Sequence, residues 1–206
     1  MKKIFVIVFV CLLFANCKNY KSKFDNSEIK DINEIVKIVI IEDSLNVLKS
    51  ESKSKMFCEN LIKLDIYIPE KRKHNEPIPP PLPPSFNNVS IENLLYYKID
   101  NEIFFTSKDS LFLLEQNLKP KELKIENEII EKINATSKKI EQEKKKIGKS
   151  YNYYEMTIPV FSKDNQNAYL ELNHYCGYLC GSGKSIYLKK LNGKWRIVDK
   201  WRTWIS

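Results

Sequence analysis

The last quarter of the chain, residues 152–204, reads NYYEMTIPVFSKDNQNAYLELNHYCGYLCGSGKSIYLKKLNGKWRIVDKWRTW. Apolar and polar residues alternate along four segments of this stretch, a pattern typical of strands that bury one face. The pair Asn192-Gly193 separates the last two segments and favours the positive φ angles of a two-residue hairpin. We therefore predict a meander of four antiparallel strands. Pro159 marks the first strand as an edge or a bulged strand, because proline lacks the N–H that a ladder needs.

Helices are expected before the meander. Asp25 can cap a helix over 26–41, where isoleucine and valine recur at helical spacing. A short helical turn is predicted over 90–95. A longer helical region is expected over 122–147, with a break near Asn134. These segments supply helices that can pack on the sheet.

Two further segments carry local signals. Residues 61–68 alternate in polarity and predict one half-buried strand that ends at Pro69. A helix over 108–118, capped by Ser107 or Asp109, is expected to stop before Pro120. Its inward stripe is predicted to consist of Leu111, Leu114 and Leu118.

Together these elements predict a single α+β domain over 26–206, with helices packed on the antiparallel meander at 152–204. An apolar content of 43% is enough to bury a core. Residues 77–84, PIPPPLPP, favour polyproline II and are expected to form a stiff crossing over the surface of this domain. A ligand for an aromatic groove in another protein is the alternative for this segment.

The N-terminus has the pattern of an export signal. Lys2 and Lys3 precede an apolar run over 4–14, and Ala15-Asn16-Cys17 follows it. The run is shorter than the roughly 20 residues that a membrane-spanning helix needs. This order of charge, apolar run, small residue and cysteine resembles the lipobox of bacterial lipoproteins, with Asn16 in place of the usual Gly, Ala or Ser.

The resemblance implies a signal peptide over 1–16, acylation of Cys17 and a polar tether over 17–25. Secretion with cleavage nearby and an uncleaved anchor are the alternatives. We expect a chain that is lipid-anchored to a bacterial membrane in the cell envelope, facing the periplasm or the surface. Loss of the two N-terminal lysines changes the net charge from +8 to +6. An exported protein of this charge is not expected to bind nucleic acid.

The loop Gly181-Ser182-Gly183-Lys184-Ser185 is not predicted to bind nucleotide phosphates. A phosphate loop of the form G-x-x-x-x-G-K-[ST] needs its first glycine at the position of Tyr178, and a helix must follow it. A strand is expected after this loop instead. We therefore predict no nucleotide and no other cofactor.

Cys176 and Cys180 are predicted to form a disulfide. The export signal directs the chain to an oxidising compartment, and the short spacing can close a small loop. Free or redox-active thiols and a zinc site completed by His174 remain the alternatives. Cys58, beside two apolar residues, is interpreted as a small buried hydrophobic residue.

His174 continues the apolar face of Leu170 and Leu172, so we expect a hydrogen-bonded core histidine. An enzyme that uses His174 as general base is the alternative, and it needs a cavity and a carboxylate beside the imidazole. The chain contains neither G-x-S-x-G nor H-E-x-x-H. We therefore predict no catalytic residue and no metal site.

The loop between the second and third strands of the meander collects three of the five glycines and both paired cysteines. A loop pinned by a disulfide loses little entropy when it binds a partner. Tyr175, Tyr178 and Lys184 are therefore the candidate binding residues. A purely structural clip is the alternative. Trp195, Trp201 and Trp204 are expected to seal the core, although some of their surface can lie exposed beside cations.

The stretch 158–206 looks like the C-terminal part of small uncharacterised bacterial envelope lipoproteins. The residues that carry the likeness are the Cys-Gly-x-x-Cys-Gly-x-Gly loop, the Asn-Gly-Lys-Trp turn and the closing Trp-Ile-Ser. The closing Gly-Lys-Trp-Arg-Ile-Val strand is also similar to the last strand of nuclear-transport-factor-2-like cones, a fold used for catalysis and for binding. Neither resemblance implies a particular activity. We expect a non-catalytic envelope lipoprotein that binds a partner protein or a small ligand.

Overall fold

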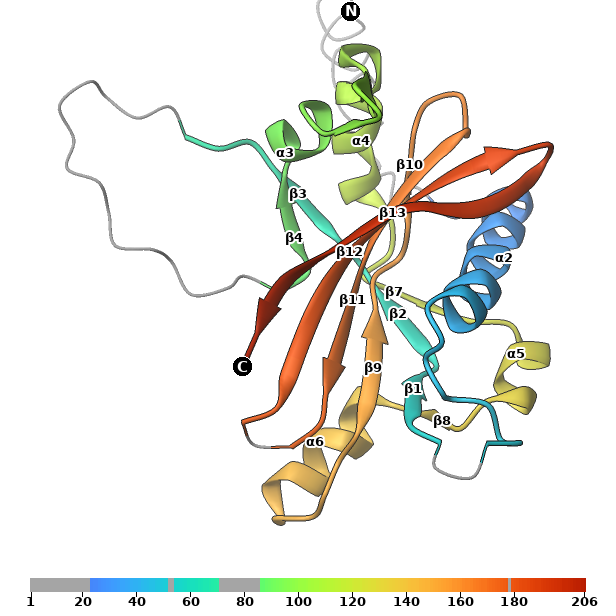
Figure 1. Ribbon diagram of the computed structural model, residues 1–206, viewed down its shortest axis with the longest axis vertical. Coiled ribbons are helices and arrows are strands. Elements are labelled where there is room, and N and C mark those ends of the chain that lie inside the picture. Colours follow the sequence, from blue (N-terminus) through green and yellow to red (C-terminus); the bar gives the residue numbers. More distant parts are fainter. Residues whose placement is uncertain (1–22, 52–53, 71–85, 178) are drawn as a thin grey trace, which may run out of the picture.

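The computed structural model describes residues 23–51, 54–70, 86–177 and 179–206 (Figure 1). The signal peptide predicted over 1–16, Cys17 and the Pro-rich crossing over 77–84 lie outside these residues, as does Tyr178. None of the helices in the described part is both long and apolar enough to cross a membrane.

The predicted meander is present and forms one side of a wider sheet, from its edge inward. Its strands are β9 (Tyr153–Met156), β11 (Asn167–Tyr175), β12 (Gly181–Leu191) and β13 (Lys194–Ile205), and neighbours in this series pair antiparallel. Asn192 and Gly193 join the last two strands with φ angles of 52° and 76°. Positive φ at both positions is what a tight two-residue hairpin requires. The α+β fold class is therefore confirmed.

Pro159 interrupts the first strand of the meander, as predicted. Before it, β9 pairs with residues 172–175 of β11, and after it β10 (Val160–Phe161) pairs with residues 168–169 of the same strand. Of the two pieces, β9 lies inside the sheet, because β1 (Met56–Cys58) pairs parallel to its other side and β8 (Ala135–Thr136) pairs parallel to β1. Among the described residues, β10 pairs with β11 alone. The sheet is therefore mixed and wider than the predicted four strands.

Residues 61–68 do not form one strand, and that prediction is wrong. The pairs are β2 (Asn60–Ile62) with β7 (Glu122–Lys124) and β3 (Asp65–Tyr67) with β4 (Asn88–Ser90). The side chain of Asn117 holds β3, the second half of this segment. It accepts from the N–H of Ile66 at 2.9 Å and donates to the carbonyl of the same residue at 2.7 Å. Leu61 and Leu64 consequently enter different hydrophobic clusters.

The region 122–147 is helical only in part. Its first residues form β7, and α5 (Asn127–Lys132), β8 and α6 (Lys138–Lys146) follow. The predicted break near Asn134 is correct. The N–H of Asn134 donates to the carbonyl of Val47, and its own carbonyl accepts from Phe57, each at 2.9 Å. Pairing with distant segments therefore replaces the helical hydrogen bonds at this point.

The helix predicted over 108–118 is in the right place, but of its predicted inward stripe only Leu114 packs against the core, where it is partly buried. A 3₁₀ turn over Ser107–Asp109, α4 (Ser110–Glu115) and a second 3₁₀ turn over Gln116–Leu118 make up the segment. Leu113 is fully buried, whereas Leu111 is 75% exposed and Leu118 is 58% exposed. The tighter 3₁₀ turns at both ends change the angular spacing of the side chains. The stripe read at ideal helical spacing was therefore out of phase.

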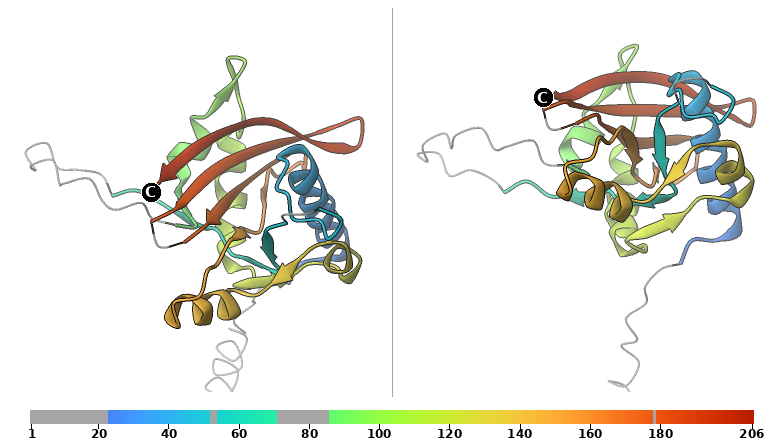
Figure 2. Two further views of the ribbon diagram at one scale, coloured as in Figure 1. Left: turned by 60° about the horizontal axis from the view of Figure 1, so that its bottom comes forward. Right: turned by 90° about the horizontal axis from the view of Figure 1, so that it is seen from below.

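Two hydrophobic clusters lie on opposite faces of the meander (Figures 1 and 2). On one face, α2 (Asn26–Glu42) and apolar residues of β11 and β12, among them Leu170, belong to one cluster that extends to α5. On the other face, α3 (Ile91–Leu95), α4 and the β3–β4 pair cover Tyr169 and Tyr187. A small hairpin of β5 (Lys98–Ile99) and β6 (Glu102–Ile103) follows α3. Alternation along β11 thus supplies side chains to both clusters.

Asp31 connects α2 to three parts of the meander. Its carboxylate accepts hydrogen bonds from Lys190 at 2.8 and 3.0 Å, from the indole of Trp195 at 3.1 Å and from the amide of Asn165 at 2.6 Å. Burial acts to raise the pKa of Asp31, but these bonds and the charge of Lys190 outweigh it and lower the pKa below its ordinary value. Trp195 is fully buried, as expected of a residue that seals the core.

The same helix covers the edge of the sheet along β13. The side chain of Glu34 accepts from the backbone N–H of Trp195, and that of Glu42 accepts from Ile197, each at 3.3 Å. Glu42 also pairs with Arg196 at 2.8 Å. These backbone groups of an edge strand therefore have partners supplied by α2.

We expect Asp31→Asn to lower the free energy of unfolding by about 2–4 kcal/mol at pH 7, because Lys190 loses its buried counter-ion. The lowered pKa means that the stabilisation is present above the ordinary pKa of 3.8 and is lost as the pH falls below it. The variant should therefore lose less stability than the wild type on acidification. Urea unfolding followed by circular dichroism over a pH series measures both effects. Asp100→Asn, at an exposed position, is the matched control, and equal destabilisation by both variants would contradict this role of Asp31.

Candidate functional site

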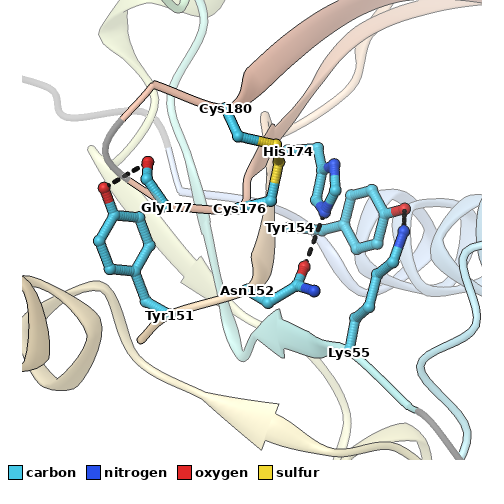
Figure 3. The surroundings of a disulfide bond; sticks show 8 residues. All are labelled: Lys55, Tyr151, Asn152, Tyr154, His174, Cys176, Gly177 and Cys180. Atoms are coloured by element: carbon cyan, nitrogen blue, oxygen red, sulfur yellow. Dashed lines mark hydrogen bonds between the residues drawn. A yellow bond between two sulfur atoms is a disulfide. The ribbon is translucent and has the colours of Figure 1, made fainter. Parts of the chain in front are cut away.

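Cys176 and Cys180 are joined by a disulfide, which confirms the predicted pairing (Figure 3). The N–H of Cys176 donates to the carbonyl of Cys180 at 3.0 Å, and the hydroxyl of Tyr151 donates to the carbonyl of Gly177 at 2.6 Å. Because each sulfur is bonded to the other, neither is free to hold zinc with His174. No group of three or more metal-binding side chains occurs in the part of the chain that the structure describes.

Cys58 is buried and carries a free thiol. Burial, together with the negative charges of Glu155 and Glu141, raises the pKa of this thiol to about 12. The group therefore stays protonated at neutral pH. This environment fits the interpretation of Cys58 as a small buried hydrophobic residue.

His174 is half-buried and hydrogen-bonded, with its Nε2 2.8 Å from the Oδ1 of Asn152 (Figure 3). Its ring stacks on Tyr154 with 4.4 Å between the centroids. Burial, and then the positive charges of Lys55 and Lys184, lower the pKa of His174 to about 4. The imidazole is thus neutral at neutral pH. The side-chain amide of Asn152 holds this imidazole, whereas a carboxylate would orient a general base.

The structure separates the residues that were predicted to bind a ligand. Tyr175 lies on the face of β11 opposite to α2, with its ring centroid 6.1 Å from that of Trp204. Lys184 lies on the α2 face, and its Nζ is 2.7 Å from the carboxylate of Asp43. Tyr178 falls outside the described residues. Tyr175 and Lys184 are therefore not brought together, and a binding role for this loop stays a prediction.

Trp204 explains two glycines of this loop. Its indole lies across β12, so that a Cβ at Gly181 would come within 2.8 Å of the ring and one at Gly183 would overlap with it. The Nε1 of Trp204 donates to the Oδ1 of Asn173 at 3.0 Å, which fixes the indole in place. The glycines that suggested a phosphate loop therefore make room for an aromatic side chain.

A cavity of about 590 Å³ opens on the face of the sheet opposite to α2, and we call it the Glu171 cavity. Side chains of β11, β12 and β13 line it on the sheet side, and those of β3, β4 and the α3 segment line it opposite. The volume falls within the roughly 300–1,000 Å³ of typical small-molecule sites. Aromatic residues are prominent in the lining, namely Tyr67, Tyr96, Tyr97, Tyr169, Tyr187, Trp201 and Trp204.

Glu171 lies in this cavity beside two hydroxyl groups. The hydroxyl of Tyr169 donates to the carboxylate at 3.2 Å and is 2.8 Å from the hydroxyl oxygen of Ser185. The backbone N–H of Asn87 donates to the second carboxylate oxygen, also at 3.2 Å. Burial raises the pKa of Glu171 to about 7, and these hydrogen bonds offset only part of that rise. The cavity therefore contains a carboxyl group that changes charge near neutral pH.

The aromatic walls are held by contacts of their own. Tyr97 stacks on Tyr187 with 4.0 Å between the centroids and 9° between the planes. The hydroxyl of Tyr97 donates to Asp199 at 2.5 Å, and the side chain of Trp201 hydrogen-bonds to Tyr187. The walls are thus positioned by the protein before any ligand enters.

Reasoning from the sequence missed this cavity. Along β11 the apolar residues Leu170 and Leu172 alternate with Tyr169 and Glu171, and alternation alone assigns the second pair to the polar face. In the structure that face is covered by the β3–β4 pair and α3, so Tyr169 and Glu171 are buried. The available signal was the pair of Tyr169 and Glu171, an aromatic residue and a carboxylate on the same face of β11. A face exposed to solvent needs neither of them.

Comparisons of the chain with models of protein families, with curated proteins and with solved structures gave no match. The resemblance to envelope lipoproteins therefore stays a prediction. The geometry of the Glu171 cavity is the basis for a functional conclusion.

Glu171→Gln should make the protein more stable than the wild type at alkaline pH. The folded state raises the pKa of Glu171 from 4.5 to about 7, so the wild type loses stability as the pH rises between these values. We expect a difference of about 2–3 kcal/mol in favour of the variant above pH ~8, and little difference below pH ~4.5. Chemical unfolding across this pH range measures it. Glu92→Gln, at the exposed rim of the cavity, is the control, and parallel pH profiles for Glu171→Gln and the wild type would contradict the assignment.

Proposed function

We propose that the chain is a non-catalytic lipoprotein of the bacterial cell envelope whose α+β domain binds a small ligand in the Glu171 cavity. The cavity is the observation that carries the binding part of this proposal. Small-molecule sites combine apolar and aromatic walls with a few placed polar groups. Here tyrosine and tryptophan side chains provide the walls, and Glu171, Ser185 and Thr203 provide polar groups.

Contacts behind the walls support a binding role. Tyr97 is held by Asp199, and Trp204 is held by Asn173, both through hydrogen bonds. Side chains that are ordered in the free protein lose little conformational entropy when a ligand binds. The cavity is therefore suited to hold a ligand without rearrangement of its walls.

The contacts of the polar groups favour binding over chemistry. A serine nucleophile needs a neighbouring base, but the hydroxyl of Ser185 is hydrogen-bonded to that of Tyr169. His174 extends from the other face of β11 and is hydrogen-bonded to Asn152. An enzyme that uses His174 as general base, the alternative from the sequence, would have to work outside the Glu171 cavity.

The N-terminal sequence supports the envelope location. Cys17 follows a short apolar run, and the polar tether over 17–25 leads to α2, which begins at Asn26. An acyl group on Cys17 would hold the domain at a membrane, so the membrane is its first proposed partner. The cavity would then meet small ligands or partner proteins of the envelope, and no nucleic acid.

The anchor can be tested by metabolic labelling with a fatty-acid probe in a bacterial host. The wild type should incorporate the probe, whereas Cys17→Ser should not, because it removes the thiol that is acylated. Cys58→Ser is the matched control and should be labelled like the wild type. Equal labelling of the wild type and Cys17→Ser would remove the lipoprotein part of the proposal.

The ligand site can be tested with Gly183→Ala. The added methyl group overlaps with the indole of Trp204 and should displace this wall, at a cost of about 1–3 kcal/mol in the free energy of unfolding. Binding of small molecules from a panel of amines, saccharides and aromatic acids, followed by ligand-observed NMR, should weaken at least about tenfold. Ser182→Ala changes the neighbouring residue of β12 and should bind like the wild type.

A second variant keeps this test decisive if Gly183→Ala fails to fold. Thr203→Trp places a large side chain at an exposed position of the cavity lining, where folding tolerates it. It should block the same panel members. Binding that survives in a folded Thr203→Trp protein, or a panel with no binder, would refute the assignment of this cavity.

A further inference from the structure

The charge of the Glu171 cavity is unusual for this chain, and the following inference rests on the proposed ligand-binding role. Lysine and arginine number 34, and the net charge is +8. The lining residues that the structure describes nevertheless include Glu92 and Glu171 and neither lysine nor arginine. Such a lining attracts cations and repels anions.

Among the residues that the structure describes, the contacts of Glu171 provide no positive partner for its negative charge. Its carboxylate accepts from the hydroxyl of Tyr169 and from the backbone N–H of Asn87, and both donors are neutral. Buried charges in proteins are normally paired with an opposite charge or a metal. Burial accordingly raises the pKa of Glu171 to about 7. A positively charged group inside the cavity would supply the missing partner.

Aromatic rings line the same cavity as this carboxylate and expose part of their surface. Tyr67, Tyr96 and Trp201 are 48%, 76% and 45% exposed, and Trp204 lines the same cavity. The faces of tyrosine and tryptophan carry negative electrostatic potential and attract ammonium groups. The rings and the carboxylate therefore favour the same kind of ligand.

We propose that the Glu171 cavity binds an organic ammonium ion, with the charged nitrogen between the carboxylate of Glu171 and the aromatic walls. A neutral sugar can stack on the same rings, but it gains no charge attraction from an ionised Glu171. An anion meets a carboxylate, and none of the described lining residues is basic. The charge of Glu171 therefore distinguishes an ammonium ligand from both.

Glu171 is the group whose ionisation should control the affinity. Burial raises the pKa of the neighbouring Tyr169, Tyr187 and Tyr97 above the ordinary value, so these hydroxyls stay neutral up to alkaline pH. Glu92 lies exposed on α3. Among the described residues, the titratable groups that line the cavity together with Glu171 are Tyr169 and Tyr187 on the sheet, Tyr67 on β3, and Glu92, Tyr96 and Tyr97 on or next to α3.

Isothermal titration of the purified protein with choline, and with its uncharged isostere 3,3-dimethylbutan-1-ol, tests the inference. Choline should bind at least about tenfold more tightly than the isostere at pH ~8.5. Its affinity should fall about tenfold at pH ~5.5, where Glu171 is protonated. Glu171→Gln should weaken choline binding about tenfold at the higher pH and remove the pH dependence. Glu143→Gln removes the same charge from the exposed surface of α6 and should bind like the wild type.

Three results would overturn the inference and leave the proposed function in place. The first is equal affinity for choline and its isostere, and the second is unchanged choline binding by Glu171→Gln. The third is tighter binding of N-acetylglucosamine than of choline in the same cavity. If neither choline nor any member of the panel binds, the inference and the proposed function both fail.

A second arm separates two sources of the ammonium group. Sedimentation with phosphatidylcholine vesicles compares a lipid headgroup with free choline. Co-sedimentation that the wild type shows and Glu171→Gln lacks would assign the ligand to the lipid. Choline binding without co-sedimentation would assign it to a soluble amine.

Discussion

The buried carboxylate of Asp31 determines how α2 lies on the sheet. One negative charge on the helix meets a lysine of β12, an indole of β13 and an amide from the turn before β11. A buried carboxylate is tolerated only when such partners are present. The helix therefore has few orientations in which its apolar face and its charge are both satisfied. The larger hydrophobic cluster follows from this placement.

The same strands contribute to the hydrophobic cluster under α2 on one face and line the Glu171 cavity on the other. Leu170 and Leu172 of β11 belong to the cluster under α2, whereas Tyr169 and Glu171 point to the Glu171 cavity. Because α2 secures the sheet, the opposite face need not be fully covered. The β3–β4 pair and the α3 segment cover it in part, and the space they leave contains a carboxyl group that is costly to ionise.

Local signals in the sequence predicted much of the fold. The meander, the Asn192-Gly193 turn, the helix capped by Asp25 and the disulfide all depend on residues close together in the chain. The parts that were missed depend on distant pairing. The strands β1 and β8 join the sheet only because residues almost 80 apart in sequence lie side by side, and the division of 61–68 depends on Asn117.

The candidate site shows the same limit. The composition of the sequence pointed to the glycine-rich loop as a candidate binding site. In the structure, Gly181 and Gly183 leave room for the indole of Trp204, which comes from the end of the chain. The residues that line the Glu171 cavity come from five separate stretches, and no spacing pattern joins them. Periodicity assigned Tyr169 and Glu171 to a face without indicating what covers it. A cavity is a property of the packed elements and not of any one of them.

The contacts between α2 and β13 also bear on how this molecule behaves among its copies. An edge strand with free N–H groups can pair with a strand of another chain and start aggregation. Glu34 and Glu42 occupy two of these groups on β13, and their negative charges would face any incoming strand. The helix α2 thereby also hinders this part of the edge from pairing with a strand of a second molecule. This protection matters most where many chains are crowded on a surface.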